Sequence, residues 1–109
     1  MATAYKVLGQ SIPTFNTSNN LYTVPAGNSA VVSTLNVCNL NATNVTFRLA
    51  VCPGGAALAN LHYIAYDTAI QAQDSIGLTM GITLAATDVV RVLSVAGNVA
   101  FSLFGSEIY

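Results

Sequence analysis

The stretch "SIGLTMGITLAATDVVRVLSVAGNVAFSLFG", residues 75–105, decides the fold of this chain. Within 75–84 and 98–105 an apolar residue stands at every second position, which is typical of β-strands with one buried face. Between these runs lies a third apolar segment, 88–95, and the connections "AATD" and "VAGN" are rich in turn residues. The stretch therefore predicts three consecutive strands joined by short turns.

The same pattern recurs through the rest of the 109 residues. Turn-forming sequences such as "VPAGNS", "NLNAT" and "CPGGAA" separate further strand-like segments, and no helical period lasts three turns. These additional segments are 4–12, 21–24, 31–39, 44–52 and 61–67. About eight strands at this spacing predict an all-β, single-domain β-sandwich that is jelly-roll-like and antiparallel. The pattern leaves open the choice between a jelly roll and other sandwiches.

Three details of the pattern predict how the strands lie. Residues 1–20 contain a polar, irregular part and are expected to form an N-terminal arm or a first strand, with the sandwich spanning 21–109. Strict alternation places Val31, Leu35 and Val37 on one face of their strand. The segment "LHYIAYD" (61–67) is apolar on both faces, which predicts a central strand or an outer face covered by a partner.

The chain is unusually poor in charge. Only 6% of its residues are charged, against about 25% in an ordinary globular protein. Although 53% are hydrophobic, no run approaches the ~18 apolar residues of a spanning helix, and we expect neither a signal peptide nor membrane binding. Its polarity comes from ten Asn, eleven Thr and eight Ser, and the net charge of −1 favours association. We therefore expect much of the surface to lie against other subunits.

Several function classes lack their usual signals. Nucleic-acid binding needs clustered cations, but Lys6, Arg48 and Arg91 are far apart in the sequence. The single histidine, His62, has no recognisable nucleophile partner, and neither a metal-ligand cluster nor a Gly-rich phosphate loop occurs. We therefore expect no enzyme activity, no catalytic residue, no cofactor and no metal.

The two cysteines, Cys38 and Cys52, are expected to be free thiols. If their strands formed one hairpin about "NLNAT", Cys52 would lie opposite residues 30–32 and about 20–27 Å from Cys38. A disulfide needs Cα atoms within about 7 Å. This reasoning fails if the strands belong to different sheets, and a bridge between subunits stays open.

Five tyrosines raise the alternative of a carbohydrate-binding module. Sugar sites commonly stack a ring on Trp or Tyr beside acidic groups, whereas this chain has no Trp and only Asp67 near Tyr63 and Tyr66. We favour the other interpretation, that the tyrosines pack at subunit contacts, where tyrosine is enriched.

Four runs of the sequence resemble small virion proteins of tailed bacteriophages. They are "LYTVPAGNSAVVSTLNVCNLNATNVTFRLAV" (21–51), "HYIAYDTAI" (62–70), "GITLAATDVVRVLS" (81–94) and "FSLFGSEI" (101–108). The resemblance lies in the cadence of strands and turns. It implies a short, all-β, charge-poor protein that is built into the particle in many copies.

The resemblance implies a structural role without an enzymatic one. We expect a capsid decoration (cement) protein that is made in the host cytoplasm, resides in the virion and stabilises the head through contacts between subunits. Its expected partners are copies of itself, as a trimer, and the major capsid protein or other virion proteins. A tail, baseplate or fibre component is the alternative, and a carbohydrate-binding module is a lesser one. The candidate subunit interface consists of His62, Ile64, Tyr66, Phe104, Ile108 and Tyr109.

Overall fold

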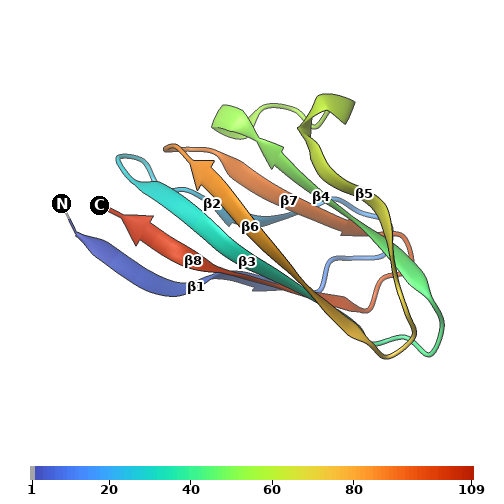
Figure 1. Ribbon diagram of the computed structural model, residues 1–109. Helices are drawn as coiled ribbons and strands as arrows, with labels where there is room; N and C mark the ends of the chain where they lie inside the picture. Colours follow the sequence, from blue (N-terminus) through green and yellow to red (C-terminus); the bar gives the residue numbers. More distant parts are fainter. Residues whose placement is uncertain (1) are drawn as a thin grey trace.

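The computed structural model describes residues 2–109 and consists of two four-stranded antiparallel sheets packed face to face (Figure 1). Its eight strands agree closely with the predicted segments, and two short 3₁₀ turns lie between β4 and β5, the second of which replaces the first two residues of the predicted strand 61–67. The strands are β1 (Thr3–Ser11), β2 (Asn19–Thr23), β3 (Ser29–Asn39), β4 (Val45–Cys52), β5 (Tyr63–Ile70), β6 (Ser75–Leu84), β7 (Val89–Ser94) and β8 (Val99–Ile108). The turns are η1 (Pro53–Gly55) and η2 (Asn60–His62). No helix of the described chain is long and apolar enough to cross a membrane.

The strand order identifies the sandwich as a jelly roll. One sheet has the order β1-β8-β3-β6 and the other β2-β7-β4-β5. Strand 1 thus pairs with 8, 2 with 7, 3 with 6 and 4 with 5, as in a long antiparallel hairpin that has been rolled into two layers. The predicted fold class is therefore confirmed, and the choice left open by the sequence falls on the jelly roll.

The core fills the space between the two inner faces. Phe47 of β4 and Phe101 of β8 meet edge to face across it, with ring centroids 5.9 Å apart. Leu35, Leu49 and the other apolar residues at alternate strand positions pack around this pair with almost no exposed surface. The period of two in the sequence therefore reports the packing of one sheet on the other.

A β-bulge in β3 overturns one detail of the predicted pattern. The pairing with β8 shifts between Val32 and Thr34, so Ser33 is an extra residue relative to β8, and the pairing with β6 also shifts at this point. The side-chain alternation reverses there: Val32 is fully buried and Val31 is exposed. The expectation that Val31 shares a face with Leu35 and Val37 is therefore wrong, because strict alternation does not survive a bulge.

The segment that is apolar on both faces is not central. β5 begins at Tyr63, after the η2 turn, and forms an edge of the β2-β7-β4-β5 sheet. In Figure 1 it lies at the outer side of the sheet, next to the 3₁₀ turns. A position at the sheet's centre therefore does not explain its apolar outer side chains.

The N-terminal segment belongs to the sandwich. Residues 3–11 form β1, which pairs with β8 along its length, and the backbones of Ala2 and Tyr109 exchange hydrogen bonds. Figure 1 shows both termini at the same end of the molecule. Of the two possibilities for residues 1–20, a first strand describes residues 3–11, while Met1 lies outside the described residues.

The cysteines lie in different sheets. Cys38 is on β3 of the first sheet and Cys52 is on β4 of the second, and both are free thiols. The hairpin on which the distance argument depended does not exist, because β3 and β4 cross between the layers. Cys52 is fully buried, whereas Cys38 is partly buried.

Candidate interaction surfaces

Charge is distributed unequally between the two sheets. In the described chain, the β1-β8-β3-β6 sheet carries only Lys6 and Glu107 as charged residues. The ammonium of Lys6 lies 3.1 Å from one oxygen of Glu107, and the hydroxyl of Tyr22 donates a hydrogen bond of 2.5 Å to the other. These contacts lower the pKa of Glu107, with the hydrogen bond from Tyr22 as the largest cause. Glu107 thus joins this sheet to β2 through Tyr22, while Lys6 neutralises it within the sheet.

The outer side of this sheet is the neutral face, defined by its outward residues Tyr5, Val7, Val31, Ser33, Gly77, Thr79, Gly81, Thr83, Ser102, Phe104 and Ser106. Tyr5 is 87% exposed and Val7 and Val31 are also exposed. Together with Phe104 they line a shallow hollow of about 500 Å³, and the nearby Lys6 has its ammonium paired with Glu107. The face therefore combines exposed apolar side chains with uncharged hydroxyl groups, and Ser33 and Ser106 line the same hollow. Such a surface can bind another neutral surface without removing charges from water.

A second feature is the edge groove, which lies between β5 and β6 and is lined by Ile64, Ala65, Tyr66, Thr68, Gly77, Leu78, Thr79 and Met80. β6 is an edge strand of ten residues that contains neither a charge nor a proline. Its inward side chains Ile76, Leu78, Met80 and Ile82 are only partly buried. Natural sheets usually protect an edge of this length with charges, bulges or proline.

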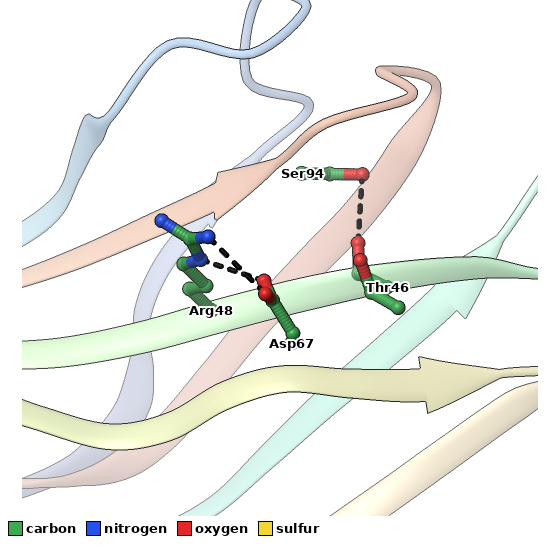
Figure 2. A network of polar contacts seen from close by, with 4 residues as sticks. All are labelled: Thr46, Arg48, Asp67 and Ser94. Atoms are coloured by element: carbon green, nitrogen blue, oxygen red, sulfur yellow. Dashed lines mark hydrogen bonds and ion pairs between the residues drawn. The ribbon is translucent and has the colours of Figure 1, made fainter.

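The opposite outer surface carries the remaining strand charges. Arg48 of β4 and Asp67 of β5 form a two-point ion pair, with Nε–Oδ1 and Nη2–Oδ2 distances of 2.7 and 3.2 Å. Figure 2 shows these side chains reaching toward each other across the two strands, with Ser94 bonded to the Thr46 carbonyl nearby. The hydrogen bond from Arg48 lowers the pKa of Asp67.

Arg91 of β7 is also engaged on this surface. Its guanidinium donates to the side-chain oxygen of Asn20 at 3.0 Å and to the carbonyl of Ala56 at 2.7 Å. The contact holds the loop after η1 against the sheet. The outer side of the β2-β7-β4-β5 sheet therefore has its own polar network, unlike the neutral face.

The remaining two charged residues and a buried Asn support turns. The carboxylate of Asp88 accepts hydrogen bonds from the amides of Gly54 and Ala85, and Asp74 accepts one from Ser75. Asn39, which is 1% exposed, ties the β3–β4 and β5–β6 connections together through its amide, which donates to Thr43 and to Gln71. In the described part of the chain, no three His, Cys, Asp or Glu side chains are grouped as metal ligands would be.

Three of the sequence-predicted interface residues lie at or near the edge groove. Ile64 and Tyr66 are 57% and 55% exposed and line it. His62 instead belongs to η2, where its Nδ1 accepts the amide of Ala59 at 3.0 Å. The geometry gives His62 a local role in ordering the turn.

The other three lie on or beyond β8. Phe104 lines the hollow of the neutral face, whereas Ile108 and the exposed Tyr109 lie at the end of the molecule that holds both termini. The structure therefore distributes the six residues over the η2 turn, the edge groove, the neutral face and the end of the molecule that holds the termini. It does not bring them into one surface.

Sequence reasoning missed part of each surface. Tyr5, Val7 and Val31 form the exposed apolar part of the neutral face. The sequence pattern assigned no outer side to β1, and it placed Val31 on the buried side because the β3 bulge has no local sequence signal. Arg48 and Asp67 were not paired, because their contact depends on the β4–β5 register. The spacing of Tyr5 and Val7, two positions apart on β1, was the one local sequence signal for the apolar part of the neutral face.

Comparisons with known proteins bear on the fold. No protein-family model and no curated protein matches the sequence. A chain from the structure of infectious bursal disease virus, Gx strain, is similar in fold, with a TM-score of 0.54 and 12% sequence identity. The match covers 97% of this chain and 30% of that one. The likeness is one of fold. This chain corresponds to under a third of the length of the viral chain that it matches.

Proposed function

We propose that this chain is a non-enzymatic structural protein of a virus particle, and that it decorates a capsid as a cement protein. The neutral face is the observation that carries the proposal. A sheet whose outer side has no unpaired charge among the described residues, with Tyr5, Val7, Val31 and Phe104 at one end, suits permanent contact with another subunit. The similar fold in a virus structure adds support.

The mechanism follows from buried area. Copies associate, as a trimer about a symmetry axis, and the assembly covers junctions between subunits of the major capsid protein. Each added contact must be broken before a junction opens, so the shell resists internal pressure longer. Small outer residues such as Gly77, Gly81 and Thr83 allow close approach of a partner sheet.

A tail, baseplate or fibre component is the second candidate. The exposed Tyr66, paired with the partly buried Tyr63 on the other sheet, favours it, because exposed aromatic groups beside polar ones suit contact with a host surface. In that case the chain would be found with tails and not with heads.

The test is the solution mass of the purified chain by light scattering, followed by sedimentation with DNA-free capsid shells and with isolated tails of the virus that encodes it. A trimer that sediments with shells is the expected result. Sedimentation with tails alone would favour the second candidate, and a monomer that binds neither would contradict the proposal.

A further inference from the structure

A bulge in β5 assembles an aromatic and polar cluster on the outer side of the β2-β7-β4-β5 sheet. Phe47 pairs with Thr68 and Leu49 with Ala65, so Tyr66 and Asp67 together face one residue, Arg48. Asp67 has a φ of 48°, a left-handed conformation that a non-glycine residue seldom adopts within a strand. The backbone thus holds an unfavourable conformation that directs two consecutive side chains to the same surface.

The side chains of the cluster fix one another. The guanidinium carbon of Arg48 lies 4.0 Å from the ring centroid of Tyr66 and 5.9 Å from that of Tyr63. The two rings meet edge to face at 4.8 Å. Because Arg48 is also held by Asp67 at two points, as Figure 2 shows, the rings cannot rotate freely without breaking these contacts. Their arrangement is therefore set before any ligand arrives.

Beside the rings lies a hollow of about 370 Å³ that is lined by Asn60, Tyr63 and Tyr66. This volume falls within the range of about 300–1,000 Å³ that is usual for small-molecule sites. Tyr66 is 55% exposed, and Asn60 is exposed in the η2 turn. The hollow thus offers aromatic surface, phenol hydroxyls and one carboxamide.

The charges of the cluster restrict the class of ligand. A cationic ligand would meet Arg48, which already occupies the region over Tyr66. An anionic ligand would find Arg48 neutralised by Asp67, while Arg91 is bound to Asn20 and Ala56. A neutral ring with an apolar C–H side and several hydroxyl groups fits what remains, because it can stack on tyrosine and bond to the carboxamide.

We propose that this hollow binds one neutral pyranose of a glycan, packed against the rings of Tyr63 and Tyr66 and hydrogen-bonded by Asn60. The site lies on the opposite sheet from the neutral face, so it leaves that face free for subunit contacts. The proposal does not depend on whether the chain belongs to a capsid or to a tail.

The experiment applies the full chain to an array of neutral, sialylated and sulfated glycans, in parallel with Tyr66→Ala, Asn60→Ala and Phe15→Ala. Phe15→Ala is the matched control, because it removes an exposed aromatic side chain from the loop between β1 and β2, outside the hollow and the neutral face. Neutral glycans should be retained by the wild type and by Phe15→Ala, and bound at least about tenfold more weakly by the other two variants. Thermal unfolding of each variant checks that the fold is kept, and Asn60→Ala serves if Tyr66→Ala is unstable.

Three outcomes would overturn the proposal. They are the retention of no neutral glycan, the retention of anionic glycans alone, and an equal loss of binding in Phe15→Ala. None of them bears on sedimentation with shells or tails, so a failure here is distinguishable from a failure of the proposed structural role.

Discussion

At the scale of single residues, Glu107 is the charged group on which the packing of the two sheets depends most. It is 7% exposed, lies on the inner side of β8 and accepts hydrogen bonds from Tyr22 of the opposite sheet and Lys6 of β1. A buried carboxylate is tolerated when its oxygens are bonded in this way. Its contribution to stability should therefore depend on its ionisation.

Replacing Glu107 with Gln should lower the free energy of unfolding by about 1 kcal/mol near neutral pH, because a neutral acceptor binds Tyr22 and Lys6 less strongly. The folded state lowers the pKa of this carboxyl, so its contribution is complete above the ordinary glutamate pKa of about 4.3. The contribution is lost as pH falls through the lower pKa of the folded state. Urea unfolding of both proteins across this range should show the difference shrinking toward zero in acid.

Tyr22→Phe provides an independent check of the same network. It removes the largest cause of the lowered pKa, so the folded-state pKa of Glu107 should move toward its ordinary value and the free energy of unfolding of this variant should fall less on acidification than that of the wild type. A stability difference between Glu107→Gln and wild type that stays constant with pH would contradict this account of Glu107.

Gly105 is the second residue on which the fold depends. It pairs with Val32 beside the β3 bulge, and a Cβ on it would lie 2.1 Å from the carbonyl oxygen of Val31. Gly105→Ala should therefore force the two strands apart and lower the free energy of unfolding by about 1–3 kcal/mol. Gly77→Ala is the control, since no atom lies within 4 Å of the added methyl. Equal stabilities of the two variants in urea would show that the close approach is unimportant.

At the scale of elements, the exposed edge of β6 stands out. The strand presents ten residues without charge, proline or an edge partner in the described chain, beside the apolar edge groove. Such edges promote pairing with other chains. We infer that β6 is covered in the assembled state.

Thr79→Lys should weaken self-association, because it places a charge beside the edge groove on an outward position of β6. Thr23→Lys is the matched control, being an exposed threonine on β2, an edge strand of the other sheet. Light scattering over a range of concentrations should show a lower mass for Thr79→Lys alone. Identical masses for both variants would exclude the β6 edge from the contact.

The elements were also what the sequence predicted best. Period-two alternation and turn residues located all eight strands within a few residues, because each strand buries one side in a common core. What alternation could not give was register. The bulge at Ser33 turned Val31 outward, and the bulge in β5 brought Tyr66 and Asp67 to Arg48, and neither has a distinct local sequence signal. The candidate surfaces were therefore only partly foreseen, through Ile64, Tyr66 and Phe104.

At the scale of the whole molecule, the two outer surfaces differ in kind. One sheet has a neutral, partly apolar outer side, and the other holds Arg48, Asp67 and Arg91 in polar networks. The few charges of the chain are thus concentrated away from the neutral face. We propose that the neutral face binds the particle. A charge placed on it should be far more damaging to assembly than the same charge elsewhere.

The most direct test compares Val31→Glu with Thr23→Glu in sedimentation with capsid shells. Both positions are exposed on strands, but Val31 lies on the neutral face and Thr23 lies on the other sheet. Burying an unpaired carboxylate in an interface costs several kcal/mol, so Val31→Glu should remain in the supernatant while Thr23→Glu sediments like the wild type. Sedimentation of Val31→Glu at the wild-type level would contradict the assignment of the neutral face as the surface that binds the particle.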